Sequence, residues 1–163
     1  AGEEFNITPY GTEALGVMRI EKGHAAGNEL NGTTTALNLG LGHMVSKTKD
    51  SIGSILSERE GLTRDDALMQ VGFRPVDASD SVIAGSHLMT VGDPANAAHD
   101  QGYITSAAYS PVLSSSIGIG FLKNGAKRKG EILRAMNPVE GAEIMVEVVS
   151  THFVDPKGER LRA

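Results

Sequence analysis

One acidic residue, Glu21, stands where a carboxylate needs a partner. Ala14, Val17 and Met18 precede it at helical spacing, so Glu21 returns to the same face of a predicted helix as these apolar side chains. A carboxylate there can accept two adjacent N–H donors from a ligand, of which an aminopyrimidine edge is one example. The alternative is a solvated or ion-paired glutamate. Glu21 is therefore the first candidate binding residue.

Other residue types that perform chemistry lack the necessary spacing. The histidines are His24, His43, His87, His99 and His152, and none of them shows the short spacing of metal ligands. His24 and His43 bracket a glycine-rich loop and could meet, although a lone histidine is usually a surface or hydrogen-bonded residue. Ser114-Ser115-Ser116 lies outside any G-x-S-x-G elbow. The sequence therefore predicts neither a metal site nor a catalytic nucleophile.

Two further clusters favour structural interpretations. Gly118-Ile119-Gly120 falls inside a predicted strand, where close backbone approach or a bulge explains glycine better than a phosphate cradle does. Lys127-Arg128-Lys129 is too short a basic run for a nucleic-acid footprint and reads as a solvated turn. We therefore expect no nucleic-acid partner.

The elements that position Glu21 form a helical, loop-rich beginning. Thr12 is predicted to cap a helix that begins at Glu13 and that Gly23 ends. Residues 23–42 read as loop with one turn of helix at most, because glycines and Asx or Thr side chains interrupt any long period.

A second helix is predicted after this loop. Asp50 or Ser51 would cap it, residues 52–56 would supply its apolar face, and Gly61 would end it. Residues 1–65 are glycine-rich and too few to hold a core of their own. We expect this first part to depend on sequence outside it.

Beyond residue 65 the pattern changes to short runs rich in Val, Ile and Thr, separated by turn residues. The predicted strands are 67–75, 86–91, 102–110, 117–122, 131–134 and 143–153. Asn124-Gly125 and Asp155-Pro156-Lys157-Gly158 are turn signals, since Gly supplies positive φ and Pro presets the first turn dihedral. The predicted fold class is α+β, mainly β, with a small antiparallel, jelly-roll-like barrel over residues 66–163.

Composition limits the protein class and its location. The chain has no Cys, which excludes a disulfide framework and favours a reducing compartment. It shows no basic and apolar leader and no run of about 18 apolar residues, so we expect a cytoplasmic protein without a membrane partner. The first residue is not Met, which suggests a piece of a longer chain.

Two groups of motifs run through nearly the whole chain. The first group is Gly11-Thr12-Glu13-Ala14-Leu15-Gly16-Val17-Met18-Arg19-Ile20-Glu21-Lys22-Gly23, then Gly27-Asn28-Glu29-Leu30 and Thr33-Thr34-Thr35. The second group is Val71-Gly72-Phe73-Arg74-Pro75, Gly102-Tyr103-Ile104-Thr105-Ser106 to Ser110-Pro111, and Ile117-Gly118-Ile119-Gly120-Phe121-Leu122. Together they resemble the glycine-cleavage T protein family, in which a helix ending in Arg-Leu-Glu-Ala-Gly precedes Gly-Asn-Asp and Thr-Thr-Pro. Residues 19–24 and 31–36 look like the branch that contains the alpha subunits of heterotetrameric sarcosine oxidases.

The resemblance implies a folate site. Glu21 matches the family glutamate that contacts the pterin ring, and Lys49 falls where the family usually has a folate-contacting arginine. Lysine keeps the charge but lacks the planar two-pronged donor, so Lys49 is a departure from the pattern. The family's catalytic aspartate has no counterpart here, so no catalytic residue is assigned and the chain alone is expected to be inactive.

The resemblance also implies a reaction and its partners. An amine such as sarcosine would be oxidised to an imine by flavin, FAD or FMN, in another part of the enzyme, which would also hold NAD. Tetrahydrofolate would capture the one-carbon unit as 5,10-methylenetetrahydrofolate, leaving glycine and hydrogen peroxide. The expected partners are the other sarcosine oxidase subunits and a missing N-terminal part of the same chain.

Other interpretations stay open at this stage. The chain could be an assembly module without folate binding, or the end of a glycine-cleavage T protein or of a dimethylglycine dehydrogenase-like enzyme. A relative that works in iron–sulfur or RNA-modification pathways would be expected to carry a Cys motif, and this chain has no Cys.

Overall fold

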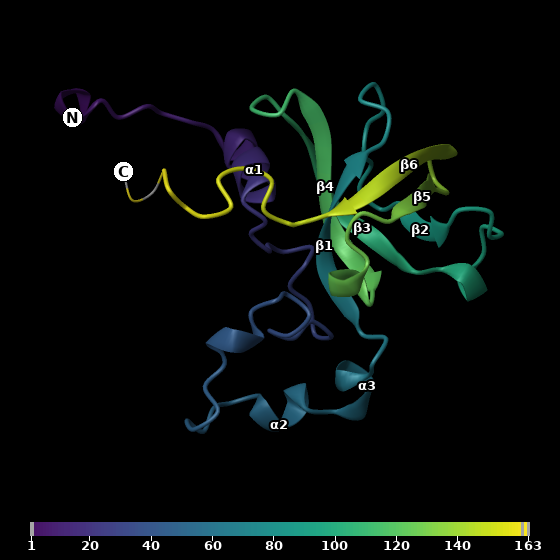
Figure 1. Cartoon of the computed structure of the whole chain (residues 1–163). Helices are drawn as coiled ribbons and strands as arrows, with labels where there is room; N and C mark the ends of the chain where they lie inside the picture. Colours follow the sequence, from purple (N-terminus) through teal and green to yellow (C-terminus); the bar gives the residue numbers. More distant parts are fainter. Residues whose placement is uncertain (1, 161, 163) are drawn as a thin grey trace.

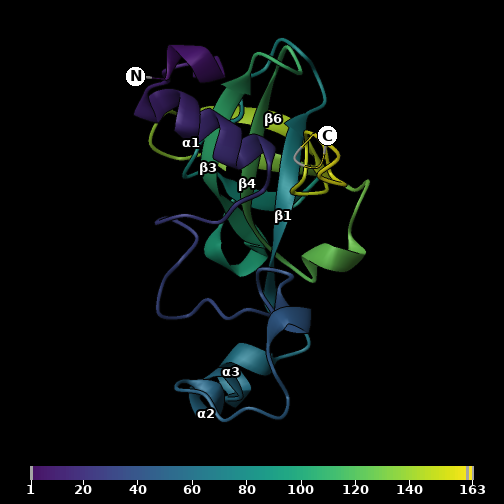
Figure 2. The ribbon, with the colours of Figure 1, turned by 90° about the vertical axis from the view of Figure 1, so that its left-hand side faces the viewer.

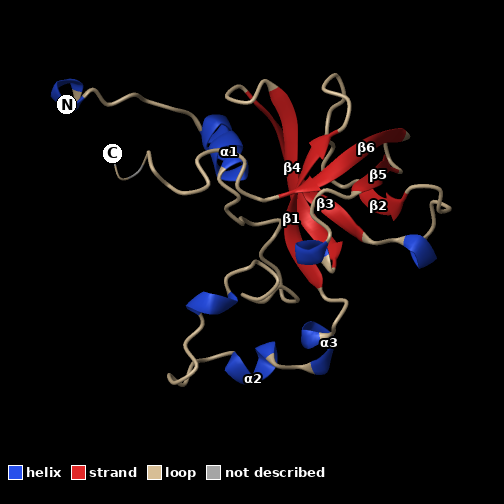
Figure 3. Ribbon diagram, viewed as in Figure 1, coloured by secondary structure: helices blue, strands red, loops and turns tan. Residues whose placement is uncertain are grey.

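The computed structural model describes residues 2–160 and 162. Strands gather into one body, and helices and loops lie outside it (Figures 1 and 3). The helical elements are η1 Glu3–Phe5, α1 Thr12–Glu21, η2 Gly42–Met44, α2 Ser54–Ser57, α3 Glu60–Thr63, η3 Ala97–His99 and η4 Gly125–Lys127. The strands are β1 Leu68–Pro75, β2 His87–Thr90, β3 Gly102–Ser110, β4 Ser115–Lys123, β5 Ile132–Asn137 and β6 Ala142–Val149.

The strands close into an antiparallel barrel in the order β1-β4-β3-β2-β5-β6. β2, β3 and β4 are consecutive neighbours and β1 returns beside β4, which is a Greek-key arrangement. Pairing of β1 with β6 completes the barrel. The predicted fold class is therefore confirmed, and among the described strands closure pairs every sheet edge.

The barrel interior holds the main hydrophobic core. Its buried members are Val71, Phe73, Val82, Leu88, Ile104, Leu122, Leu133, Ala135, Val146 and Val148. These aliphatic side chains and one phenylalanine fill the barrel, as expected from a chain with 4% aromatic residues. The barrel is the rigid support for whatever packs against its outside.

β4 is buried on both faces. Its glycines face inward, where a Cβ at Gly120 would lie 2.2 Å from the Tyr103 carbonyl oxygen and one at Gly118 would lie 2.7 Å from Val82. The prediction that these glycines serve close approach is confirmed. Ile117 and Ile119 alternate with them and face outward. That outer face requires a cover.

The cover is α1. Figure 2 shows this helix lying across the outer side of the barrel. Ile20, in its last turn, packs against the β4 isoleucines, with Ala108 and Phe153 around them. This second, smaller cluster fixes the end of α1, and therefore Glu21, against β3 and β4.

The first helix differs slightly from its prediction. It begins at Thr12 rather than Glu13, and Gly11 occupies the cap position without a side-chain cap bond. The prediction of Thr12 as the cap is therefore wrong. The helix ends at Glu21, and Gly23 follows with φ +73, as the helix-stop interpretation requires.

The predicted second helix is wrong in extent. Two single-turn helices, α2 and α3, replace it, and Gly61 lies inside the second of them. Gly53 before α2 has φ +90, and Ile52 and Ile55 are exposed. A short helix without a surface to bury its apolar face does not extend, because packing provides most helix stability.

The last strand is shorter than predicted. β6 ends at Val149 instead of residue 153, and the chain then leaves the barrel and crosses to the end of α1 (Figure 1). The backbone N–H groups of Phe153 and Val154 donate to the Glu21 carbonyl oxygen at 2.9 and 3.0 Å. These residues therefore hold α1 in place.

The turn at Asn124-Gly125 is present, with one correction. Asn124 rather than Gly125 adopts positive φ, at 55°. Gly125 instead provides space, because a Cβ there would approach Val71 at 2.7 Å. Among the described residues, no helix has the length and apolar character needed to cross a membrane.

Candidate functional site

Glu21 is buried at the end of α1, with 7% of its surface exposed. Its Oε1 atom accepts a hydrogen bond of 2.5 Å from Ser110 Oγ at the end of β3. Ser110 is itself fully buried. Within the described part of the chain, this hydroxyl is the hydrogen-bond donor to the Glu21 carboxylate, so most of its acceptor capacity is free.

A cavity of about 420 Å³ opens beside this carboxylate. Its lining residues are Leu15, Met18, Arg19, Glu21, Lys22, His24, Val154, Asp155 and Arg160. Small-molecule sites typically measure about 300–1,000 Å³ and combine apolar walls with a few polar groups. Of the α1 face predicted from sequence, Met18 and Glu21 line this cavity, whereas Ala14 and Val17 line a different one on the other side of the helix.

The C-terminal segment forms the opposite wall and is fixed to α1. Lys22 Nζ donates to the Asp155 carbonyl oxygen and lies 3.3 Å from Asp155 Oδ2. Burial raises the pKa of Asp155, but the backbone N–H of Glu159 and the Lys22 ammonium lower it by more. At Gly23, a Cβ would lie 2.5 Å from the Thr151 carbonyl oxygen. The two walls therefore meet in close backbone contact.

Lys49 lies apart from this cavity. It is exposed, on the loop between η2 and α2, and its backbone N–H donates to Ser46 Oγ at 3.1 Å. The structure does not bring Lys49 to Glu21, because it is absent from the lining of the cavity. The loop that carries it, residues 45–53, lies below the barrel in Figure 1, away from α1.

A second carboxylate, Glu29, was not predicted as a site residue. It is fully buried, and each of its oxygens accepts two hydrogen bonds. Thr105 Oγ1 and Ser106 Oγ donate to Oε1 at 2.5 and 2.7 Å. Arg19 Nη1 and the Ala26 backbone N–H donate to Oε2 at 2.8 and 2.9 Å. Its acceptor capacity is thus used by the protein itself.

A β-bulge makes this arrangement possible. The register of β3 against β4 slips between Ile104 and Ser106, so Thr105 is an extra residue. In a regular strand, Thr105 and Ser106 would point to opposite faces. Here both hydroxyls reach the same Glu29 oxygen. The bulge therefore directs two donors at one carboxylate.

The protonation state of Glu29 follows from these donors. Burial alone raises the pKa of its carboxyl, but the surrounding hydroxyl, amide and guanidinium donors outweigh burial and hold the pKa below its ordinary value of 4.5. Glu29 is therefore a carboxylate at neutral pH. Its partner Arg19 also donates from Nη2 to Ser106 Oγ at 2.6 Å.

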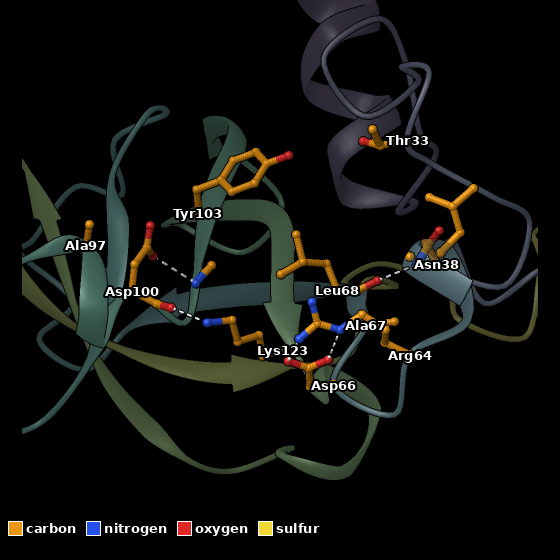
Figure 4. A pocket seen from close by; sticks show the side chains of 13 residues that line it. Thr33, Asn38, Arg64, Asp66, Ala67, Leu68, Ala97, Asp100, Tyr103 and Lys123 are labelled. Atoms are coloured by element: carbon orange, nitrogen blue, oxygen red, sulfur yellow. Dashed lines mark hydrogen bonds and ion pairs between the residues drawn. The ribbon is translucent and has the colours of Figure 1, made fainter. Parts of the chain in front are cut away.

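A larger cavity, of about 540 Å³, lies between the loop segments and the barrel end (Figure 4). Its charged groups are already paired. Arg64 binds Asp66 through two hydrogen bonds of 2.9 and 2.8 Å, and Lys123 Nζ donates to the Asp100 carbonyl oxygen at 2.7 Å. In the Glu21 cavity, by contrast, a buried carboxylate retains spare acceptors. The Glu21 cavity is the candidate site.

The histidines do not assemble around it. His24 lines the Glu21 cavity, whereas His43 lies in η2 and does not line it. Among the described residues, no group of three His, Asp or Glu side chains is placed to hold a metal ion.

Comparison with known proteins defines the class. Residues 1–49 match the GCVT N-terminal domain, and residues 69–155 match the Glycine cleavage T-protein C-terminal barrel domain. The chain belongs to the glycine cleavage T-protein family.

Within this class, the chain is similar to sarcosine oxidase alpha subunits. It is 42% identical to the "Sarcosine oxidase subunit alpha" of Rhizobium meliloti over 99% of this chain and 16% of the relative. It is 39% identical to that of Corynebacterium sp. strain U-96, over 98% of this chain and 17% of the relative. The resemblance predicted from residues 19–24 and 31–36 is confirmed. This chain therefore spans a small share of these relatives' length.

Aminomethyltransferases are similar as well. The "Aminomethyltransferase" of Halothermothrix orenii is 32% identical over 94% of this chain and 41% of the relative. The crystal structure of glycine cleavage system aminomethyltransferase T from Bartonella henselae superposes with a TM-score of 0.71 at 20% identity. That match covers 95% of this chain and 42% of the other, and it supports the fold.

Proposed function

We propose that this chain is a folate-binding portion of a larger one-carbon enzyme, in which Glu21 accepts the N–H donors along a pterin edge. The observation that carries this proposal is a buried carboxylate beside a cavity, held by a single hydroxyl from Ser110. Glu21 Oε2 is not among the buried side-chain atoms that lack a hydrogen-bond partner, so the free acceptors of this carboxylate are accessible to donors of a ligand in the cavity. A pterin carries adjacent N–H groups that match two carboxylate oxygens.

The other lining residues fit a flat aromatic ligand. Leu15, Met18 and Val154 offer apolar surface, and the Ser110 hydrogen bond fixes the orientation of the carboxylate. Ser110 occupies one lone pair of Oε1, so both Glu21 oxygens can still accept donors from a ring edge. When bound, tetrahydrofolate captures a one-carbon unit as 5,10-methylenetetrahydrofolate.

The substrate proposal rests on the named relatives. Because the chain is similar to sarcosine oxidase alpha subunits, we propose sarcosine as the amine and glycine as the product. Hydrogen peroxide would form at a flavin in another part of the enzyme, which would also hold NAD. The proposed partners are the other subunits and the rest of the chain, in the cytoplasm, and this portion alone would be inactive.

Lys49 keeps a secondary place in the proposal. It lies where the family usually carries a folate-contacting arginine, and its exposed loop would have to reach the ligand once the remaining protein packs against residues 1–65. A lysine would offer a point charge to the ligand rather than a two-pronged donor. Its contribution should therefore be smaller than that of Glu21.

The experiment is the Glu21→Ala variant of the intact enzyme. We expect the yield of 5,10-methylenetetrahydrofolate per amine oxidised to fall, while amine oxidation at the flavin continues. An unchanged yield would count against the proposal. A parallel Glu147→Gln variant serves as the control, because Glu147 forms an exposed ion pair with Arg74 and does not line the Glu21 cavity.

A second candidate function is subunit assembly without folate binding. It is favoured by exposed apolar side chains of the first part of the chain, among them Phe5, Ile7, Tyr10, Leu41, Met44, Val45, Ile52, Ile55 and Leu56. Such a surface suits packing against further protein. A folate titrated into the assembled enzyme would give no saturable heat if this candidate were correct. The division into residues 1–65 and 66–163 stays part of the proposal.

A further inference from the structure

Three consecutive residues in the last turn of α1, Arg19, Ile20 and Glu21, contact one face of β3. Ser106, Ala108 and Ser110 alternate along the strand and therefore share its outer face. Arg19 bonds Ser106, Ile20 packs in the cluster that includes Ala108, and Glu21 accepts from Ser110. The direction of the Glu21 carboxylate thus depends on the register between this helical turn and β3.

The charged contact in this register is Arg19 with Glu29. Arg19 uses Nη1 for Glu29 and Nη2 for Ser106, so its guanidinium bridges the loop and the strand. Glu29 in turn is held by Thr105 and Ser106 at the bulge. A planar guanidinium with two fixed partners limits both rotation and sliding of the helix end. These contacts add a directional restraint to the Ile20 packing and to the backbone bonds from Phe153 and Val154, which also hold this helix end.

We propose that Glu29 is a positioning residue for the ligand of Glu21. Through Arg19 it fixes the end of α1 on β3, so that the Glu21 carboxylate faces the cavity in one orientation. Glu29 itself is fully buried and absent from the cavity lining, so it does not touch the ligand. This inference rests on the proposed function of Glu21 as the pterin contact.

The test is a double-mutant cycle on ligand binding in the intact enzyme. The probe is 5-formyltetrahydrofolate, a stable reduced folate, and the variants are Glu29→Gln, Glu21→Gln and both together. Thermal unfolding is recorded for each variant. We expect Glu29→Gln to raise the Kd about tenfold in the wild-type background and less than about twofold in the Glu21→Gln background.

A milder variant keeps the test usable if Glu29→Gln does not fold. Thr105→Val removes one donor to Glu29 with little change in shape, and we expect it to raise the Kd about threefold, again only when Glu21 is present. Glu147→Gln, the same substitution in an exposed ion pair, should leave the Kd unchanged.

The outcomes separate the two claims. If Glu21→Gln leaves the Kd unchanged, the proposed function is wrong. If Glu21→Gln weakens binding but Glu29→Gln and Thr105→Val lower only the melting temperature, the positioning role is wrong. Equal Kd increases in both backgrounds would also overturn it, because they would mean that Glu29 acts independently of Glu21. Loss of the Glu29 effect in the Glu21→Gln background supports it.

Discussion

Two buried carboxylates dock the same stretch of chain onto the same strand, yet their surroundings are opposite. Glu29 accepts two hydrogen bonds on each oxygen and does not line the Glu21 cavity. Glu21 receives one hydroxyl and lines a cavity of about 420 Å³. The first pattern belongs to a carboxylate that the fold needs, and the second to a carboxylate with capacity left for a ligand.

The difference shows how burial and function can be separated. Burial alone does not identify a site, because Glu29 is more buried than Glu21. Unused acceptors beside a cavity are more informative, since they are available to the donors of a ligand. The comparison therefore favours a structural and positioning role for Glu29 and a direct binding role for Glu21.

The largest expected effect is the loss of stability on Glu29→Gln. The neutral amide would leave the partly buried Arg19 guanidinium without its charge partner and replace one acceptor oxygen by a donor, which should lower the free energy of unfolding by about 3 kcal/mol. Glu21→Gln should lower it by less than about 1 kcal/mol. Denaturant titration of both variants measures the contrast, and equal losses would contradict it.

A next, smaller effect is expected at the junction of the cavity walls. Gly23→Ala places a side chain at φ +73 against the Thr151 carbonyl oxygen, so the free energy of unfolding should fall by about 2 kcal/mol. Gly16→Ala is the matched control, because Gly16 lies within α1 with open space around it. This variant should raise the free energy of unfolding by up to about 1 kcal/mol. Destabilisation by both variants would argue against a specific contact at Gly23.

Acid should weaken the Glu29 cluster. The folded-state pKa of Glu29 lies below its ordinary value of 4.5, so its stabilising contribution is complete above that value and is lost as pH falls through the folded pKa. The stability difference between the wild type and Glu29→Gln should therefore narrow as pH falls from about 5 to about 3. Urea unfolding across this range measures it, and a constant difference would show that the Glu29 charge does not contribute.

The smallest effect is expected at Lys49. Its side chain is exposed, so Lys49→Ala should change the free energy of unfolding by less than about 0.5 kcal/mol. The same variant should weaken reduced-folate binding only slightly compared with Glu21→Gln. A larger loss of binding at Lys49 than at Glu21 would reverse the proposed ranking of the two residues.

The sequence predicted the barrel well because its strands follow local rules. Five of the six predicted runs contain an observed strand or overlap most of one, since β-branched residues and turn signals act over a few positions, and the run 131–134 covers only the first half of β5. The exceptions depend on distant contacts. The chain leaves the barrel after Val149 and binds the end of α1 through Phe153 and Val154, and the helix predicted after Asp50 fails for lack of a packing surface.

The candidate site was predicted in part for the same reason. Glu21 was found because helical periodicity places it beside Met18, and the family motif reinforces it. The role of Ser110 depends on a contact with Glu21, 89 residues away, and that of Glu29 on a contact with Thr105, 76 residues away. The Glu29 contact also needs the β-bulge in β3, which no local sequence pattern predicts. A glutamate in a glycine-rich loop, together with adjacent Thr and Ser in a strand, was the signal available for Glu29.

The most direct measurement is a calorimetric titration of 5-formyltetrahydrofolate into the intact enzyme and its Glu21→Gln variant. We predict saturable heat for the wild type and a Kd at least about tenfold higher for the variant, because a neutral amide replaces a charged acceptor. Absence of saturable heat in the wild type, or the same Kd in both proteins, would contradict the assignment of the Glu21 cavity as a folate site.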